Sequence, residues 1–411
     1  MKKKILIADD DDLICSLVKT RLKKDYEVFT AQDGEEALVL TRRLLPDLLI
    51  CDLMMPKLHG FAVVQELRAD EKFRTLRILV SSAKAYPADQ KTALELGADA
   101  YLTKPFDIEV LAAKVKELLA SGAETPIWLR FWGTRGSIAT PGPKTTKYGG
   151  NTACTEVRYR DELIIFDAGT GARELGLALI EEFKGKPIEA HIFIGHSHWD
   201  HIQGFPFFSP AYQAGNAFTI YSVRGAQRSL EKVFTGQMDR DYFPVALGEM
   251  QAKLRFVELD EPVVISDATI SFTYLNHPGL AIGFRMDAGN KSLVYISDNE
   301  PYQRLVAEDN LLEKLDQNLV EFSRRADLLI CEAQYTDEEY KHKRGWGHSA
   351  LSDVLELALA AQVKQLALFH HDPMHTDEMI DAMVEQCQEK LRQRQTSLVC
   401  FAACEGLTFT I

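Results

Sequence analysis

The chain has 411 residues, of which 46% are hydrophobic, and a formal net charge of −13. This length exceeds what one hydrophobic core usually serves, so it predicts two domains. No apolar run approaches the roughly 20 residues that span a bilayer, which argues against a membrane protein and a secreted one. Seven cysteines without a CxxC spacing predict reduced, buried thiols and hence a cytoplasmic protein.

The charge is unevenly distributed along the chain. Residues 1–121 contain 19 basic and 20 acidic side chains, which leaves 28 of the 47 basic and 40 of the 60 acidic ones for residues 122–411. An acidic surface disfavours nonspecific attraction to nucleic-acid phosphates. Polymeric nucleic acid is therefore a disfavoured substrate for the C-terminal part.

Short apolar segments alternate with amphipathic ones in residues 1–121. Strands are predicted at 5–8, 26–30, 47–51, 76–81 and 100–103, and helices at 12–24, 34–44, 60–69, 87–96 and 107–120. This alternation predicts an α/β domain built on a doubly wound parallel sheet. The functional crevice of such a sheet lies beyond the carboxyl ends of its strands.

Polar residues stand at these strand ends. Asp9 and Asp10 follow the first strand, Asp52 the third, Ser82 the fourth and Lys104 the fifth. Three converging carboxylates repel one another unless a hard cation lies among them, and oxygen ligands at this density suit Mg²⁺. The sequence therefore predicts a magnesium site at which a phosphoryl group can be accepted.

This set of residues resembles the receiver domain of two-component response regulators, which has a flavodoxin-like fold. The resemblance implies that Asp52 is phosphorylated through a cognate histidine kinase, and that Asp9, Asp10 and Asp52 form the magnesium site. It also implies that Ser82 and Tyr101 are the switch residues and that Lys104 contacts the phosphate. The receiver domain is expected to span residues 1–121.

A short linker is predicted at residues 122–127, because Gly122 and Pro126 are helix-stopping and turn residues. Neither a helix-turn-helix pattern nor a basic patch follows it. The sequence thus predicts no DNA-binding domain, and the output is expected to be a second domain at residues 128–411.

The most informative segment of that second domain is the run His-Ser-His-Trp-Asp-His from His196 to His201, directly after the apolar stretch 188–194. Four ligand-type side chains within six residues at a strand end can supply two metal ions. Further candidate ligands stand near predicted strand ends or in Gly/Pro turns: His277, Asp298, His348, His370 and His371.

This pattern resembles the metallo-β-lactamase superfamily, which has an αββα sandwich fold. The resemblance implies that one metal is held by His196, His198 and His277, the second by Asp200, His201 and the last histidine, with Asp298 bridging both. His370 is favoured as that last ligand because it directly follows a predicted strand, and His371 competes with it. Imidazole and carboxylate ligands without thiolate favour zinc, with manganese and iron as alternatives.

Segments at 131–137, 166–171, 331–335 and 347–350 are similar to the ribonuclease Z and cyclic phosphodiesterase branch. The resemblance implies that His348 contacts the phosphate or leaving group and that Asp200 orients the nucleophile. Glu332 is either a partner that raises the basicity of His348 or a structural carboxylate, and Asp167 supports the metal ligands from behind.

The segment between His201 and His277 lacks the basic arm that ribonuclease Z enzymes use for transfer RNA. It carries several aromatic residues instead, including Phe205, Phe207 and Tyr242. These residues form either an aromatic lid for a nucleotide-like substrate or a local core or dimer interface.

The sequence thus predicts a cytoplasmic response regulator whose output is a binuclear, metal-dependent phosphodiesterase. The expected substrate is a small phosphodiester such as a cyclic nucleotide or a cyclic sugar phosphate. A thioester or lactone hydrolase of the same fold and a ligand-binding signalling protein without turnover are the alternatives. The natural substrate, the metal, the kinase, the sign of regulation and homodimer formation stay open.

Overall fold

The computed structural model describes residues 2–73, 76–82, 87–120, 125–225, 228–305 and 310–411. The chain divides into two compact units, residues 1–124 and 125–411. The linker predicted at 122–127 falls in part on residues 121–124, which lie outside the described ranges. Of the helices within these ranges, none is both long enough and apolar enough to cross a bilayer.

The N-terminal unit is built on one parallel sheet with the strand order β2-β1-β3-β4-β5. Its strands are β1 (Lys4–Ala8), β2 (Glu27–Ala31), β3 (Leu48–Asp52), β4 (Arg77–Ser82) and β5 (Ala100–Thr103). Its helices are α1 (Asp12–Leu22), α2 (Gly34–Leu44), α3 (Gly60–Ala69), α4 (Pro87–Glu95) and α5 (Ile108–Ala120), with a 3-10 turn at η1 (Glu71–Phe73). The predicted doubly wound sheet is confirmed. Helix α1 begins where it does because the Asp11 side chain accepts hydrogen bonds from the backbone N–H groups of Leu13 and Ile14.

The C-terminal unit contains two mixed seven-stranded sheets. The first, in the order β11-β10-β9-β8-β7-β6-β19, consists of β6 (Trp128–Gly133), β7 (Cys154–Tyr159), β8 (Glu162–Phe166), β9 (Glu189–Phe193), β10 (Ala217–Ser222), β11 (Lys253–Glu258) and β19 (Thr408–Thr410). The second, in sequence order, consists of β12 (Val263–Ile265), β13 (Ala268–Leu275), β14 (Ala281–Ala288), β15 (Lys291–Ile296), β16 (Leu328–Glu332), β17 (Gln365–Phe369) and β18 (Val399–Ala402). Strands β8 to β11 are parallel to one another, and so are β15 to β18.

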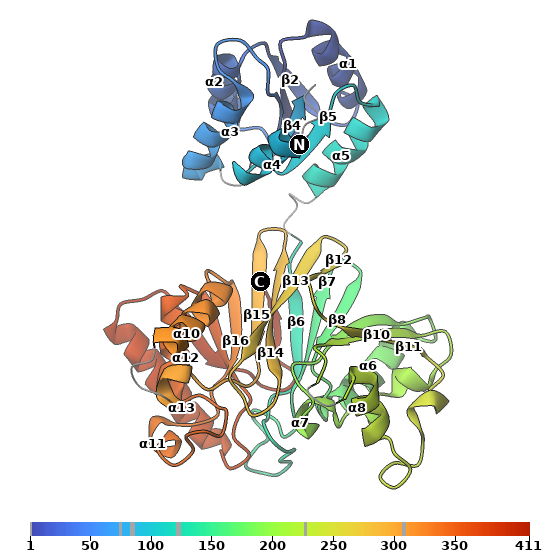
Figure 1. The fold of residues 1–411 in the computed structure, drawn as a ribbon, viewed down its shortest axis with the longest axis vertical. Helices are drawn as coiled ribbons and strands as arrows, with labels where there is room; N and C mark the ends of the chain where they lie inside the picture. The colour runs from blue at the N-terminus through green and yellow to red at the C-terminus, as the bar shows by residue number, and fades with distance from the viewer. Residues whose placement is uncertain (1, 74–75, 83–86, 121–124, 226–227, 306–309) are drawn as a thin grey trace. The chain divides into compact units, whose positions relative to one another are not determined.

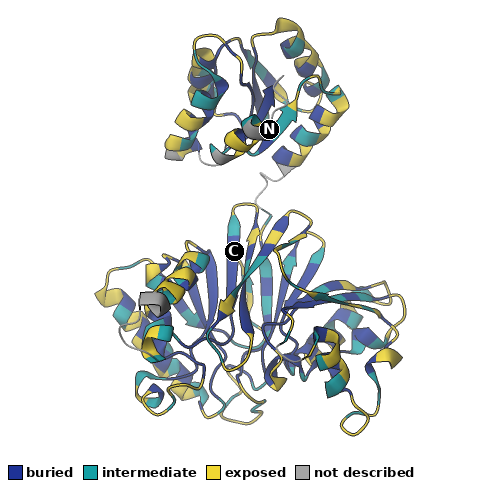
Figure 2. Cartoon of the chain, viewed as in Figure 1, coloured by how far each residue is buried: buried dark blue, intermediate teal, exposed yellow. Residues whose placement is uncertain are grey.

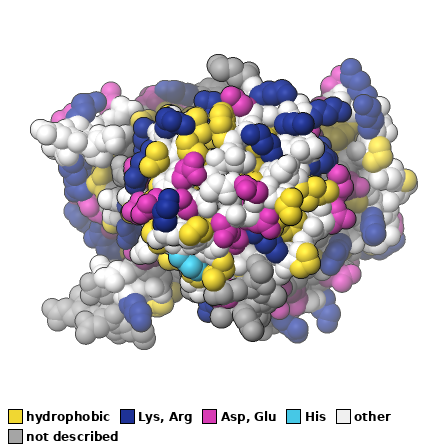
Figure 3. All heavy atoms as spheres, turned by 90° about the horizontal axis from the view of Figure 1, so that it is seen from above, with side chains coloured by type: hydrophobic (Ala, Val, Ile, Leu, Met, Phe, Trp, Pro, Cys, Tyr) yellow, Lys and Arg dark blue, Asp and Glu magenta, His cyan; other side chains and the backbone are white. Residues whose placement is uncertain are grey.

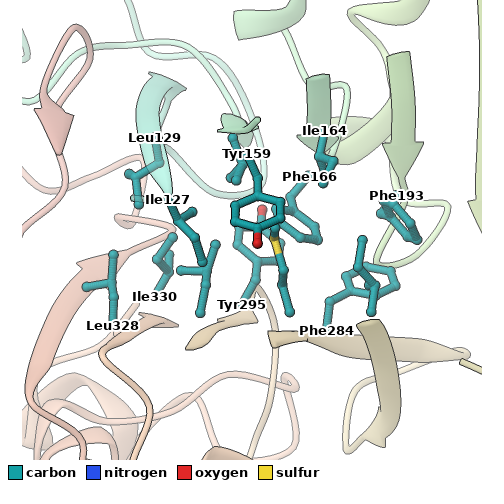
Figure 4. Close-up of a cluster of buried hydrophobic side chains, with 14 of the residues drawn as sticks. Ile127, Leu129, Tyr159, Ile164, Phe166, Phe193, Phe284, Tyr295, Leu328 and Ile330 are labelled. Atoms are coloured by element: carbon teal, nitrogen blue, oxygen red, sulfur yellow. The ribbon is translucent and has the colours of Figure 1, made fainter. Parts of the chain in front are cut away.

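A buried aromatic cluster joins the two sheets (Figure 4). Phe166 of β8 stacks on Tyr295 of β15 with ring centroids 5.2 Å apart, and Phe193 of β9 meets Phe284 of β14 edge to face at 5.4 Å. Side chains that alternate along each strand point into this layer, which is the reason for the period-two burial of β6. The cluster therefore fixes how the strand ends of one sheet meet those of the other.

Helices cover the outer faces of this sandwich (Figure 1). The helices that connect strands of the first sheet are α6 (Gly171–Phe183), α7 (Trp199–Ile202) and α8 (Leu230–Gln237). The same connections contain 3-10 turns at η2 (Phe205–Phe207), η3 (Ser209–Tyr212) and η4 (Leu247–Glu249). The second carries α9 (Tyr302–Leu305), α10 (Asn310–Ser323), α11 (Asp337–Tyr340), α12 (Leu351–Ala360) and α13 (Asp377–Gln393). Strands are largely buried and helices are exposed along one side (Figure 2). The predicted αββα sandwich is thus confirmed.

Charged side chains of both signs are interspersed on the face shown in Figure 3, with small hydrophobic areas between them. Acidic and basic groups that alternate in this way do not form a single-sign field that would attract a polyanion.

Candidate functional site

The candidate site lies at the carboxyl ends of parallel strands in both sheets. Asp167 follows β8 and His196 follows β9 in the first sheet, while Asp298 follows β15 and His370 follows β17 in the second. Because the aromatic core holds the two sheets face to face, these chain segments converge at one edge of the sandwich.

One group of potential ligands consists of His196, His198 and His277, whose nearest nitrogen atoms all lie within 4.8 Å of one another. Nε2 of His277 lies 3.1 Å from Nδ1 of His198. Burial lowers the pKa of His196 well below its ordinary value, so this imidazole is neutral near pH 7. Neutral imidazole is the form that binds a metal ion.

A second group consists of Asp200, His201 and His370. Oδ2 of Asp200 lies 3.1 Å from Nε2 of His370 and 3.2 Å from Nε2 of His201. All three side chains are buried. The structure thus brings together the residues that the superfamily resemblance assigns to the second metal.

Asp298 lies between the two groups. Its Oδ2 atom is 3.2 Å from Nε2 of His201 and 3.8 Å from Nδ1 of His196, and its Oδ1 atom is 3.4 Å from Nε2 of His370. One carboxylate therefore faces ligands of both groups, which is the position that a bridging ligand needs.

These side chains fit a pair of divalent ions by their unsatisfied atoms. Both ring nitrogens of His196, Nε2 of His201 and Oδ2 of Asp298 are buried without a hydrogen-bond partner in the described part of the chain. Buried polar atoms are ordinarily paired, so several unpaired polar atoms at one point are consistent with a site that binds a cation. The donor set of nitrogen and oxygen atoms suits zinc, manganese or iron.

Asp167 positions the second group from behind. Its Oδ2 atom accepts hydrogen bonds from Nδ1 of His201 at 2.7 Å and from the Tyr295 hydroxyl at 2.8 Å, and its Oδ1 atom accepts one from the Gly195 backbone N–H at 2.8 Å. The carboxylate thereby fixes the ring of His201, directs its Nε2 atom toward Asp200 and Asp298, and fixes the backbone just before His196.

Two further positioning residues act on this group. The backbone N–H of Ser137 donates to Oδ2 of Asp200 at 2.7 Å, and Nδ1 of His370 lies 3.0 Å from Oε1 of Gln334. Sequence reasoning assigned no role to Ser137, Gln334 or Tyr295, because none is a metal-ligand type. Their only signal was that Ser137 and Gln334 belong to segments similar to the phosphodiesterase branch.

The structure separates His370 from its neighbour. His371 is fully buried, and its Nε2 atom lies 3.0 Å from the carbonyl oxygen of Ala403. Its ring packs edge-on against Tyr148 with centroids 5.6 Å apart. His371 therefore lies in the packing around the site, and only His370 is in the ligand group.

His348 lies beside the two groups and lines their cavity, which has a volume of about 420 Å³. Its Nδ1 atom is 3.6 Å from Oδ1 of Asp298 and has no hydrogen-bond partner among the described residues. Burial lowers the pKa of His348 to about 3, although Asp298 opposes this shift. His277, Asp298 and His348 also satisfy the distances of a ligand set, so metal content must be measured when His348 is replaced.

Glu332 was expected either to raise the basicity of His348 or to be a structural carboxylate, and its contacts favour the structural role. Its carboxylate accepts hydrogen bonds from the backbone N–H groups of Asn299 at 3.2 Å, Gln334 at 3.1 Å and Ser349 at 2.6 Å. Its Oε1 atom lies 3.9 Å from Nδ1 of His348. Because its oxygens are engaged by the backbone, it makes no hydrogen bond to His348. Glu332 holds the loops around the site in place.

The receiver residues meet at the edge of the N-terminal sheet. Asp9, Asp10 and Asp52 form a group whose oxygen atoms lie within 4.8 Å of one another. Nζ of Lys104 lies 2.7 Å from Asp9 and 2.6 Å from Asp52. Burial opposes the charge of Lys104, but its hydrogen bonds to Asp52 and Asp9 outweigh burial and raise its pKa. The ammonium is therefore charged and placed beside the candidate phosphoacceptor.

The two predicted switch residues lie near this edge. Ser82 is buried at the end of β4, and its hydroxyl hydrogen-bonds to Tyr101 of β5. Partial burial raises the pKa of Tyr101 despite this hydrogen bond. The structure thus connects Ser82 to Tyr101 directly.

Comparison with curated proteins finds relatives of the N-terminal part. A protein named "Probable transcriptional regulator ycf27" of Cyanophora paradoxa is 46% identical over 119 residues, which are 29% of this chain and 48% of that protein. The alkaline phosphatase synthesis transcriptional regulatory protein PhoP of Bacillus subtilis is 43% identical over 120 residues, which are 29% of this chain and 49% of that protein. The chain spans about half the length of these curated relatives.

Among solved structures, the metallo-β-lactamase fold protein YhfI of Bacillus subtilis is similar over 70% of this chain and 100% of that chain, with a TM-score of 0.50 and 18% identity. At that identity the likeness shows the fold alone. The sequence profile of the response regulator receiver domain matches residues 5–116, and that of the beta-lactamase superfamily domain matches residues 163–371, about half of the chain. The chain therefore belongs to the β-lactamase superfamily, and it joins a response regulator receiver domain to a hydrolase domain of the metallo-β-lactamase fold.

Proposed function

We propose that this protein is a response regulator whose output is hydrolysis of a small phosphodiester, a cyclic nucleotide or a cyclic sugar phosphate. The observation that supports it most is the pair of ligand groups that share Asp298 and face one cavity of about 420 Å³. Two divalent ions held there would polarise phosphoryl oxygens as Lewis acids and activate water near neutral pH. We assign zinc as the metal most in keeping with the ligands.

The surrounding side chains would align the reaction. Asp200 lines the cavity, and the Ser137 backbone N–H fixes its Oδ2 atom, so it is oriented to align a water molecule against the substrate. His348 lines the same cavity and is neutral near pH 7, so it can donate a hydrogen bond to a phosphoryl or leaving-group oxygen. Neither the alignment of water by Asp200 nor hydrogen bonding by His348 requires Glu332, whose hydrogen bonds hold the loops around the site in place.

The receiver domain would control this activity. Phosphorylation of Asp52 by a histidine kinase, with Mg²⁺ held by Asp9, Asp10 and Asp52, introduces charge beside Lys104. Ser82 and Tyr101 would rearrange in response and shift an equilibrium between less and more active arrangements of the protein.

A substrate panel tests the catalytic proposal. Purified protein is reconstituted with Zn²⁺ or Mn²⁺, its metal content is measured, and turnover is assayed on phosphodiesters, thioesters and lactones. We expect two metal ions per chain and turnover of diesters. Preferential turnover of thioesters or lactones would replace the proposed substrate class, and ligand binding without any turnover would identify a sensor.

The variant His348→Ala tests the assignment of His348. We expect diester turnover to fall about 100-fold with unchanged metal content, because a substrate-facing donor is lost and the ligand groups stay intact. Loss of a metal ion from this variant would instead make His348 a ligand.

A further inference from the structure

A second cavity adjoins the metal cavity. It has a volume of about 700 Å³, and Ser197 and Trp199 line both spaces. We call it the aromatic groove and define it by Trp199, Phe207, Arg228, Gln237, Tyr242 and Phe243. Its volume falls within the range of about 300–1,000 Å³ that is usual for small-molecule sites.

The groove is lined by aromatic rings that are exposed and do not belong to the hydrophobic core. Trp199 is 77% exposed, Phe207 54% and Tyr242 82%. Phe207 is held edge to face against Phe243, with ring centroids 5.3 Å apart. Exposed aromatic rings gathered at the rim of a catalytic cavity indicate a surface for a ligand.

The segment between His201 and His277 also contributes aromatic rings to the core. Some of its rings therefore belong to the local core, and others line the groove. Phe205 and Phe234 are fully buried and meet edge to face at 4.9 Å, and Phe208 packs on Phe218 at 5.2 Å. These rings anchor the segment. Phe207 and Tyr242 line the groove, and Phe207 packs against Phe243.

Polar groups lie beside these rings. A Cβ atom at Gly236 would stand 3.3 Å from Nη1 of Arg228, so this glycine leaves room for the guanidinium at the groove wall. The amide nitrogen of Gln237, which also lines the groove, is buried without a hydrogen-bond partner among the described residues. The groove thus combines stacking surfaces with a planar cation and an unsatisfied amide.

We infer that the aromatic groove binds the base of a nucleotide substrate whose phosphodiester lies in the metal cavity. Every nucleobase offers a π-face to rings such as Phe207 and Tyr242, and the guanidinium of Arg228 can meet its polar edge. The inference rests on the proposed function and narrows its substrate class: a cyclic nucleotide would use both cavities, whereas a cyclic sugar phosphate would leave the groove empty.

The test compares two probes on the full-length, metal-loaded protein. One is 3′,5′-cyclic AMP, and the other is methyl riboside 3,5-cyclic phosphate, in which a methoxy group replaces the base. We expect kcat/KM to favour cyclic AMP by about 5- to 150-fold, which corresponds to the loss of stacking on one base. In Phe207→Ala and Tyr242→Ala this preference should shrink toward equality through a higher KM for cyclic AMP.

The control is Val264→Ala, which removes an exposed apolar side chain on β12 that lines neither cavity. It should keep the preference of the parent protein. Equal turnover of both probes by the parent protein, or a preference that survives in both aromatic variants, overturns the inference. If those variants instead change the sedimentation profile while the preference persists, the groove is an interface between two copies.

A binding measurement separates this inference from the proposed function. If neither probe nor any phosphodiester of the panel is hydrolysed at full metal loading, the proposed function fails, and equilibrium dialysis with AMP then decides the role of the groove. AMP binding that weakens about 5-fold or more in Phe207→Ala and Tyr242→Ala, but not in Val264→Ala, supports a base site. Absence of AMP binding, or binding that these variants leave unchanged, refutes it.

Discussion

Replacing Asp167 with Asn tests whether hydrogen bonds behind the ligands control the metal centre. The carboxylate is fully buried and accepts three hydrogen bonds, two at Oδ2 and one at Oδ1. An amide has nearly the same shape but only one acceptor oxygen. The oxygen will occupy the Oδ2 position, because His201 and Tyr295 both donate there.

The amide nitrogen then faces the backbone N–H of Gly195, and two donors meet without an acceptor. A buried donor left unsatisfied costs about 1–3 kcal/mol, and loss of the negative charge weakens the polarisation of His201. Since Gly195 immediately precedes His196, the displacement reaches both ligand groups. We expect metal affinity to fall about 10- to 100-fold, which corresponds to about 1.4–2.7 kcal/mol.

Two measurements on the full-length chain check this expectation. Competition with a chromophoric chelator gives the Zn²⁺ affinity, and calorimetry in excess chelator gives the melting temperature of the metal-free hydrolase domain. Each kcal/mol lost should lower that temperature by about 2–4 °C. The receiver transition provides an internal reference, because residues 1–124 are unchanged.

Asp287→Asn is the matched control. Asp287 is exposed on β14 and pairs with Arg285 at 2.9 Å, so its replacement should change stability by less than about 1 kcal/mol and leave metal affinity unchanged. If Asp167→Asn binds Zn²⁺ as tightly as the parent protein and melts at the same temperature, the hydrogen bonds to Asp167 do not organise the site.

The remaining predictions concern the last ligand, pH and regulation. We expect His370→Ala to retain about one metal ion per chain and His371→Ala to retain two, as measured by elemental analysis; the reverse result would exchange their roles. Burial lowers the pKa of His371 from 6.5 to about 3, so the unfolded chain takes up a proton that folded His371 does not. Stability of the metal-free protein should therefore fall by up to about 1.4 kcal/mol per unit as pH drops from 6.5 toward 3, and a His371→Gln chain with an equally steep denaturation profile would contradict this. Acetyl phosphate with Mg²⁺ should modify Asp52 and raise hydrolysis or change the sedimentation profile, with no response in Asp52→Asn; confirmed phosphorylation that alters neither would refute the regulatory proposal.

Much of the fold could be predicted because strand ends and ligand types are local properties of the sequence. The five predicted strands of the N-terminal unit match the observed ones to within one residue, since buried parallel strands are short apolar runs. Helix α1 ends at Leu22 instead of residue 24, because helix ends depend on caps and local turns that apolar periodicity does not specify.

The candidate metal ligands could be predicted from the sequence for a different reason. One histidine or aspartate after a strand often has a structural role, but several of them in an order that resembles a superfamily pattern indicate a ligand set. The choice between His370 and His371 was not accessible, because adjacent residues differ only in the backbone conformation that directs their side chains. His370 adopts φ 54°, in the left-handed region, which sends the two rings to opposite surroundings.

Backbone-mediated roles were also beyond sequence reasoning. The contact from Ser137 to Asp200 uses a main-chain N–H group, which every residue except proline possesses. The three backbone donors that engage Glu332 lie up to 33 residues from it in the sequence. Only the folded arrangement shows that this carboxylate is already occupied.

The composition of each ligand group also bears on how the hydrolase domain is stabilised. Each ligand group combines residues that follow the first sheet with one that follows the second. His196, His198, Asp200 and His201 come after β9, whereas His277 comes after β13 and His370 after β17. Each bound ion would therefore connect the two sheets. Its binding free energy would add to the stability of the folded domain, by about 2.7 kcal/mol at a free metal concentration 100 times the Kd. The fraction of output domain that is folded would then depend on the available metal, whether or not Asp52 is phosphorylated.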